Sequence, residues 1–382
     1  MSKNIVICCD GTNNEFGPEN TNVVRLIQLL DRDPLKQRLY YDPGVGTLPE
    51  PSAWSAFSKG LSEIFGLAFG RGLSWKVEEA YTYLMNVWEP GDRVFVFGFS
   101  RGAYTARVLA GMLHALGLLP HGNQNLVPYV MRLYGALRNQ RSAVTKWSTL
   151  CDQFRWTFAR TVPEDPSERH FHVHYVGLWD TVSSVGWAWD PRKFPYTARN
   201  PSVHAVRHAV SIDERRWFFR QNRMYQALPS QEFAQVWFPG VHSDVGGGYP
   251  ESESGLWREP FLWVLAGAMD AGLAVDAARQ AHVMSGAPST TPCNDPKHES
   301  LTAAWWPAEF FPKWQWRSDQ KRNVLAIGAG RYRRVNQGEL IHRCALVRLR
   351  DRPDYRPRNL HPQFVQTVRS LPVVPDAMPY AP

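Results

Sequence analysis

Residues 93–116 read RVFVFGFSRGAYTARVLAGMLHAL, which is a short apolar run, a glycine-rich turn and then a helical pattern. The run is apolar at consecutive positions and lacks the polar alternation of a sheet with one face in water. Such runs are typical of strands buried on both faces, which occur in parallel sheets covered by helices. The segment therefore predicts an α/β fold built around a strand at 93–100.

Four more apolar runs end, like this one, in a turn with Gly, Asp or Ser. They are NIVICCDGT (4–12), RLYYDPGVGT (38–47), FHVHYVGLWDT (171–181) and AQVWFPGVHSD (234–244). Helical patterns lie between them, which is βαβ order with right-handed crossovers. We expect three layers, with a mostly parallel sheet between two layers of helices.

The turn at 98–102, GFSRG, matches the G-x-S-x-G pattern directly after a strand and directly before a helix. This context predicts the nucleophile elbow of an α/β-hydrolase, with Ser100 as nucleophile. Gly98 and Gly102 are required because a Cβ at either position would collide with neighbouring backbone. The backbone N–H of Arg101 begins a helix, where an oxyanion is stabilised.

A serine nucleophile needs a base, and the base needs an orienting acid, in the chain order Ser, Asp or Glu, His. Asp180 ends the fourth apolar run and His242 follows the fifth, so both lie at strand ends in the required order. Asp244 is a rival acid, but two residues from His242 it is expected to shape the turn instead. The prediction is a triad of Ser100, Asp180 and His242.

The first run ends in CCDGT (8–12), which resembles the end of the DxDGT phosphatase signature. The nucleophile position would then be Cys8, which cannot form an aspartyl phosphate, so that class is disfavoured. Within a hydrolase, Asp10 shapes a loop beside the elbow. A backbone N–H of Gly11 or Thr12 is then the candidate second oxyanion donor.

The sequence predicts neither a metal nor a cofactor. The five cysteines show no CxxC or Cys/His spacing, so they indicate reduced, mostly buried thiols. His204 and His208 have the i, i+4 spacing of a helical ligand pair, but the glutamate of an HExxH site is absent.

The charge balance indicates either an anionic partner or a solvated basic surface. The chain has 43 Lys+Arg against 35 Asp+Glu, a net charge of +8, with basic clusters at RYRRV (331–335) and RLRDRPDYRPR (348–358). Lipid headgroups and nucleic acid are the anionic partners that such an excess suits. Because no block of five like charges occurs, we favour the solvated surface and expect no nucleic-acid partner.

The N-terminus is polar again by residue 10, so its apolar run is too short for a signal peptide. We expect a chain that is cytoplasmic as synthesised and has no Sec signal. A second apolar-rich stretch, 53–70, carries charges and is not a spanning helix. Its apolar stripe predicts a helix that packs on the sheet or forms a mobile wall of the site. The stripe consists of Trp54, Phe57, Leu61, Ile64 and Phe65.

Five segments together resemble an uncharacterised α/β-hydrolase domain family that includes phospholipase effectors of bacterial type VI secretion. They are CDGTNNE (9–15), GFSRGAYTAR (98–107), GLWDTV (177–182), VWFPGVHSDVGGGY (236–249) and PDYRPRNL (353–360), which span nearly the whole chain. The resemblance implies a triad at Ser100, Asp180 and His242. It also implies a lipid or acyl-ester substrate, an anionic membrane surface, a secretion-system or immunity partner, and delivery outside the cell by contact-dependent secretion.

We therefore expect a serine hydrolase of carboxylic esters, with a phospholipase or lipase activity as the leading prediction. An esterase for small soluble esters and a non-catalytic module that retains the fold are the alternatives. The catalytic domain is predicted over residues 1–285, with a cap-like helical insertion at about 111–165 over the carboxyl edge of the sheet. Residues 286–382 are predicted as an irregular extension rich in Trp and Pro, packed on the same domain.

Overall fold

The computed structural model describes residues 2–11, 17, 19–44, 69–137, 144–163, 165–182, 194–253, 255–285, 291–317 and 322–381. Thr12 and the apolar stripe from Trp54 to Phe65 lie outside these residues, so the statements about them stay predictions.

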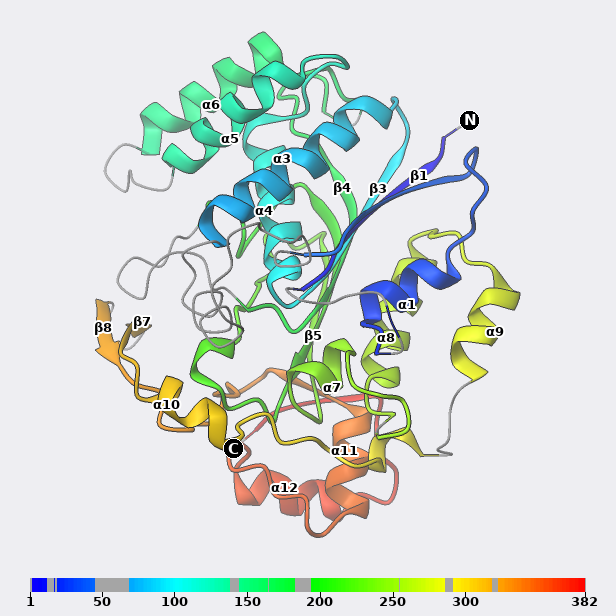
Figure 1. Ribbon diagram of the computed structural model, residues 1–382, viewed down its shortest axis with the longest axis vertical. Coiled ribbons are helices and arrows are strands. Elements are labelled where there is room, and N and C mark those ends of the chain that lie inside the picture. Colours follow the sequence, from blue (N-terminus) through cyan, green and yellow to red (C-terminus); the bar gives the residue numbers. More distant parts are fainter. Residues whose placement is uncertain are drawn as a thin grey trace.

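An eight-stranded sheet crosses the middle of the molecule (Figure 1). Its order is β10-β9-β6-β5-β4-β3-β1-β2, and all neighbours pair parallel except β9 and β10. The strands are β1 (Asn4–Cys9), β2 (Gln37–Asp42), β3 (Arg93–Phe99), β4 (Val173–Trp179), β5 (Val203–Ser211), β6 (Glu232–Phe238), β9 (Leu340–His342) and β10 (Ala377–Pro379). The predicted α/β fold with a mostly parallel sheet is confirmed.

Strand β5 contradicts one detail of the sequence prediction. The spacing of His204 and His208 predicts a helix, but residues 203–211 pair parallel with β4 and β6. The helix prediction is wrong because the segment is rich in valine and lies between two strands, where β-branched side chains pack well. His208 is buried in the sheet, where Nδ1 contacts Gln235 and Nε2 accepts the N–H of Thr181. Burial lowers the pKa of His208 to about 3, so this ring is neutral.

Helices cover both faces of the sheet (Figure 1). One layer contains α3 (Phe69–Val87), α4 (Ser100–Leu116), α5 (Val127–Ala136) and α6 (Val144–Phe158). The opposite layer contains α1 (Asn22–Leu29), α8 (Arg258–Asp270) and, beside α1, α9 (Ala277–Ser285). Strand β1 shows why both layers form, since Ile5 and Ile7 join one apolar cluster and Val6 and Cys8 join the other.

Helices α5 and α6 come from the predicted insertion at 111–165, but they lie elsewhere than expected. Arg155 of α6 donates to the carbonyl of Ala115 at 2.7 Å, in the last turn of α4. Since a helix rises 1.5 Å per residue, this contact is about 20 Å along α4 from Ser100. The two helices widen the layer of α3 and α4, because their apolar faces pack there and not over the carboxyl edge of the sheet.

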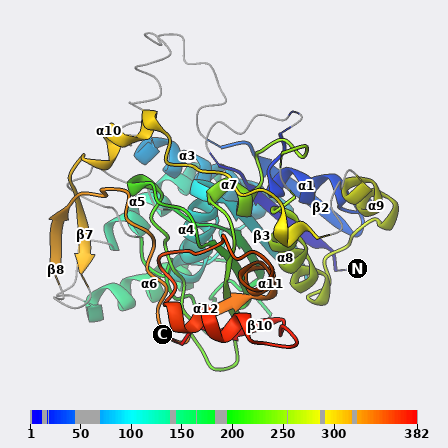
Figure 2. The same cartoon turned by 90° about the horizontal axis from the view of Figure 1, so that it is seen from below.

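Residues after 291 continue the sheet rather than forming only irregular structure. Strand β9 extends it beyond β6, and β10 closes that edge. Helices α11 (Arg343–Asp351) and α12 (Pro362–Arg369) pack beside them, and Figure 2 shows both helices near β10. The other elements of the segment are α10 (Trp306–Glu309), β7 (Lys313–Arg317) and β8 (Arg322–Ala326). A third apolar cluster joins this region to β6 through Trp237. The domain boundary at 285 stays a prediction.

Within the described ranges, none of the helices has the length and apolar character needed to cross a bilayer. The five cysteines are all free thiols, and Cys8 and Cys9 are fully buried in β1.

Candidate active site

Ser100 lies on a sharp turn between β3 and α4. Its φ is +58°, a left-handed conformation that is uncommon outside glycine. A Cβ on Gly98 would lie 2.6 Å from the backbone of Ala103, and a Cβ on Gly102 would lie 2.2 Å from the carbonyl oxygen of Cys9. The two glycines therefore allow α4 to start against β1, which presents Ser100 at the carboxyl edge of the sheet.

The structure brings Ser100, His242 and Asp180 together in one chain of hydrogen bonds. The Nε2 of His242 lies 2.8 Å from the Oγ of Ser100, and its Nδ1 lies 2.5 Å from the Oδ2 of Asp180. Asp180 follows β4, and His242 begins the short helix α7 (His242–Gly246) after β6. The carboxyl ends of parallel strands meet at one edge, which is why residues far apart in sequence converge here.

Asp180 is held as a buried anion. Its Oδ1 accepts hydrogen bonds from the N–H of Ser211 at 2.9 Å and from Nη1 of Arg333 at 2.5 Å, and its Oδ2 accepts from Nη2 of Arg333 at 2.9 Å. Burial alone would raise the pKa of Asp180, but Arg333 and His242 outweigh it and hold that pKa well below its usual range. The φ of Asp180 is +40°, a second strained backbone position at this site.

His242 is enclosed by aromatic rings. Its imidazole lies 4.7 Å from the ring of Phe99 and 4.9 Å from the ring of Phe219, centroid to centroid. Burial lowers the pKa of His242, and the hydrogen bond to Asp180 opposes that shift. The ring is therefore neutral near pH 7, as a base must be before it accepts a proton.

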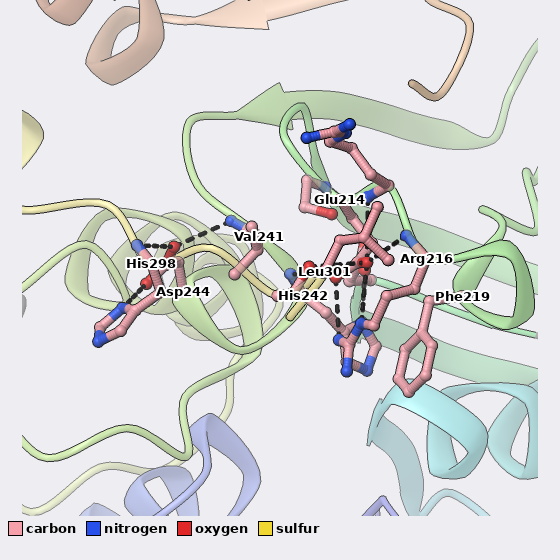
Figure 3. A network of polar contacts seen from close by, with 12 residues as sticks. Glu214, Arg216, Phe219, Val241, His242, Asp244, His298 and Leu301 are labelled. Carbon is pink, nitrogen blue, oxygen red and sulfur yellow. Dashed lines mark hydrogen bonds and ion pairs between the residues drawn. The ribbon is translucent and has the colours of Figure 1, made fainter. Parts of the chain in front are cut away.

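The backbone around His242 is fixed from two sides, which Figure 3 shows. On one side, the N–H of His242 donates to Glu214 at 3.2 Å, and Glu214 pairs with Arg216 at 2.9 Å. On the other side, Asp244 accepts the N–H of Val241 at 2.9 Å. Burial would raise the pKa of Glu214, but Arg216 outweighs it and lowers that pKa to about 2.

Asp244, the rival acid, does not face the imidazole. Besides the N–H of Val241, its carboxylate contacts His298, with Oδ1 2.6 Å from the ring Nδ1. The bond to Asp244 raises the pKa of His298. Asp244 therefore stabilises the turn before His242, and Asp180 is the carboxylate that contacts the imidazole of His242.

The predicted oxyanion donors are placed as follows. The Arg101 N–H belongs to the first turn of α4, directly after Ser100, where the positive end of the helix favours negative charge. The Gly11 N–H is engaged by Oδ1 of Asp10 at 2.7 Å. Asp10 also accepts the hydroxyl of Thr21 at 2.6 Å, so it ties the loop after β1 to the start of α1. This arrangement favours Arg101 over Gly11 as a donor.

Sequence reasoning missed Arg333, Glu214 and Phe219. Arg333 belongs to RYRRV, a cluster noted only for its charge, and neither Glu214 nor Phe219 follows a recognised motif. Among the described residues, no group of three or more His, Cys, Asp and Glu side chains is arranged to hold a metal ion.

Residues 3–267 match the family model described as "T6SS, Phospholipase effector Tle1-like, catalytic domain". The chain belongs to this Tle1-like family. The match covers the strands that carry Ser100, Asp180 and His242, and it ends before Arg333.

An uncharacterised protein of Saccharomyces cerevisiae is 39% identical to this Tle1-like chain over 227 residues, which are 57% of this chain and 32% of the yeast protein. An uncharacterised protein from Pseudomonas aeruginosa, known from a crystal structure, has 19% identity and a TM-score of 0.43, covering 75% of this chain and 48% of that one. The structure of the Tle1 effector bound to the VgrG spike of the type 6 secretion system has 19% identity and a TM-score of 0.34, covering 67% and 53%. The chain thus spans a third of the yeast relative and about half of each solved chain.

Proposed function

We propose that this chain is a serine hydrolase that cleaves carboxylic esters, with phospholipids as the leading substrate class. One observation carries the proposal: Ser100 Oγ, His242 and Asp180 form a continuous hydrogen-bonded chain, 2.8 Å and 2.5 Å long at its two links, on an elbow with positive φ at the serine. Membership of a phospholipase effector domain family supports the lipid substrate class.

The mechanism follows from the positions of these three side chains. His242 takes the proton of Ser100 through Nε2 as Oγ attacks the ester carbonyl carbon. Asp180 accepts a hydrogen bond from the Nδ1–H of His242, which fixes the tautomer and stabilises the imidazolium that forms. The developing oxyanion is stabilised by the backbone N–H of Arg101. His242 then protonates the leaving alcohol, and water attacks the acyl-enzyme by the same route.

If the substrates are phospholipids, the proposal extends to two kinds of partner. The net charge of +8 suits an anionic membrane surface, and the family suits a secretion-system or immunity partner. The membrane surface is proposed from the charge balance, and the protein partner is proposed from the family. The geometry of the site supports neither, and the proposed catalytic mechanism does not depend on them.

The test combines two measurements on purified protein. A fluorophosphonate probe labels an activated serine, and lipid mass spectrometry on mixed phospholipids reports which acyl bond is cleaved. Ser100→Ala should fold with an unchanged melting temperature, resist labelling and lose about 10⁶ in kcat, because the nucleophile is gone. Ser230→Ala, at an exposed turn before β6, is the matched control and should behave like wild type.

Three other outcomes have distinct meanings. Turnover by Ser100→Ala would mean that another group is the nucleophile. A wild-type protein that is labelled, ignores phospholipids and hydrolyses short-chain p-nitrophenyl esters would be an esterase for small soluble esters. A wild-type protein that the probe does not label would be a non-catalytic module.

A further inference from the structure

Arg333 lies in the loop between β8 and β9, outside the part of the chain that matches the family model. Its side chain is fully buried, with 0% of it exposed. A buried guanidinium is costly unless it is paired and hydrogen-bonded, so its partners indicate why it is there.

Those partners all belong to the candidate site. Arg333 bonds both carboxylate oxygens of Asp180, the arrangement that a planar guanidinium makes best. Its Nη1 also donates to the hydroxyl of Ser211 at 2.7 Å, and its Nε donates to the carbonyl of Phe219 at 3.1 Å. The ring of Phe219 packs against the imidazole of His242. Arg333 therefore holds both Asp180 and an aromatic residue that contacts His242.

The other charges near His242 largely cancel. Glu214 contacts the backbone N–H of His242, and its carboxylate is paired with Arg216 through two bonds of 2.9 Å and 3.0 Å. His208, near Asp180, is neutral. Arg333 therefore balances the negative charge of Asp180 when His242 is neutral.

We propose that Arg333 is a positioning residue of the proposed reaction, which holds Asp180 and Phe219 around His242 and keeps the Asp180–His242 pair free of an extra proton down to mildly acidic pH. The inference rests on the proposed function for its catalytic meaning, but the protonation of the pair can be measured without catalysis.

The physical reason is the net charge of the buried pair. With Arg333 present, a neutral His242 and an ionised Asp180 leave no net buried charge. Without it, the pair carries an uncompensated negative charge and binds a proton more readily, whichever residue holds that proton. The protonated pair cannot accept the proton of Ser100, so the active form would be confined to higher pH.

The experiment compares wild type with Arg333→Met, which keeps an unbranched side chain of about the length of the aliphatic part of arginine and removes the guanidinium with its charge. The apparent pKa of the pair is followed by ¹⁵N NMR of His242 in protein labelled at histidine, with His242→Gln to assign the signal. The rate of fluorophosphonate labelling is followed against pH. We expect the NMR titration and the acidic limb of the labelling rate to move up by about 1 pH unit. The plateau rate should fall by about 10²-fold, since Phe219 and Asp180 lose their common support.

Arg348→Met is the matched control, because Arg348 is also buried in the C-terminal segment but bonds the carbonyls of Cys293 and Asp295, away from the site. Its titration should equal that of wild type. Arg333→Lys keeps the charge without the two-oxygen bridge, so the limb should stay in place while the plateau rate falls about tenfold.

An unshifted titration in folded Arg333→Met would overturn the proposal. If Arg333→Met does not fold, Arg333→Lys decides, because a full plateau rate in that variant would show that the bridge is dispensable. Failure of the proposed function looks different: wild type would not be labelled at any pH, while the NMR titrations would still differ between wild type and Arg333→Met.

Discussion

Two aspartates lie close to His242 in sequence or in space, and their surroundings give them different tasks. The carboxylate of Asp180 faces Nδ1 of His242 and is anchored by Ser211 and Arg333. Asp244 is only two residues from His242, yet its carboxylate is bonded to Val241 and His298. The first carboxylate can orient the imidazole, and the second can only shape its turn.

Asp180→Asn should lower kcat by about 10⁴ per folded molecule, because the amide favours the wrong tautomer of His242. It should also cost about 3 kcal/mol in the free energy of unfolding, since Arg333 loses its buried partner. Asp244→Asn should cost about 1 to 3 kcal/mol, since the turn loses its anchor, and should reduce activity less. Labelling rates and thermal unfolding of both variants make the comparison. A larger activity loss for Asp244→Asn would show that the acid is misassigned.

The residues that sequence reasoning could place are those at strand ends. Ser100 lies there in the G-x-S-x-G turn, Asp180 and His242 lie there in the required chain order, and the three do lie together. Arg333 could not be placed because its burial depends on partners more than a hundred residues away. Its neighbours Arg331 and Arg334 are exposed, so one buried arginine stands between exposed ones in the same basic cluster.

At the scale of single elements, the elbow depends on contact between α4 and β1. A side chain at Gly102 would meet the carbonyl oxygens of Cys9 and Asp10 at 2.2 and 2.3 Å, and backbone atoms there have little room to move. The turn that carries Ser100 and the first strand are therefore packed as one unit.

Gly102→Ala should lower the free energy of unfolding by about 2 kcal/mol and should slow fluorophosphonate labelling of Ser100, because the start of α4 must shift. Gly135→Ala is the matched control within α5, where the added Cβ would have its nearest neighbour at 3.9 Å from Phe194. That change should stabilise the protein by about 0.5 to 1 kcal/mol without affecting labelling. Denaturant unfolding and labelling rates measure both effects. Equal labelling of the two variants would contradict the packing argument.

Element prediction succeeded for the five runs that contain β1, β2, β3, β4 and β6, and it failed at β5. Strands β1 and β3 are unbroken apolar runs. Strand β5 reads VHAVRHAVS, in which polar residues at 204, 207 and 208 imitate a helical period. The place where a helix packs was harder to predict than the helix itself. The sequence of α5 and α6 shows an apolar face, but it does not show which surface of the protein covers that face.

At the scale of the whole molecule, the C-terminal segment is part of the fold. Strand β9 pairs with β6 at Val236 and Trp237, and α11 and α12 complete an apolar cluster that includes Trp237. Without that segment, β6 would become an exposed edge and the side chains of the cluster would meet water.

A chain cut after residue 285 should therefore lack cooperative unfolding, although it contains the whole family match. The loss of β9, the third apolar cluster and Arg333 removes packing worth far more than the few kcal/mol by which domains are usually stable. Near-ultraviolet circular dichroism and a thermal scan of the shortened chain test this expectation. A sharp transition close to that of the full chain would show that residues 286–382 are dispensable for folding.

The two buried thiols of β1 have a consequence for chemistry that involves no substrate. Burial raises the pKa of Cys8 and Cys9, and a thiol reacts with alkylating reagents as its thiolate. Reaction therefore requires β1 to leave the sheet. Because Gly102 packs on the carbonyl of Cys9, any opening that exposes these sulfurs also dismantles the turn that carries Ser100. The rate at which an alkylating reagent modifies these two thiols should therefore report how often the turn that carries Ser100 opens.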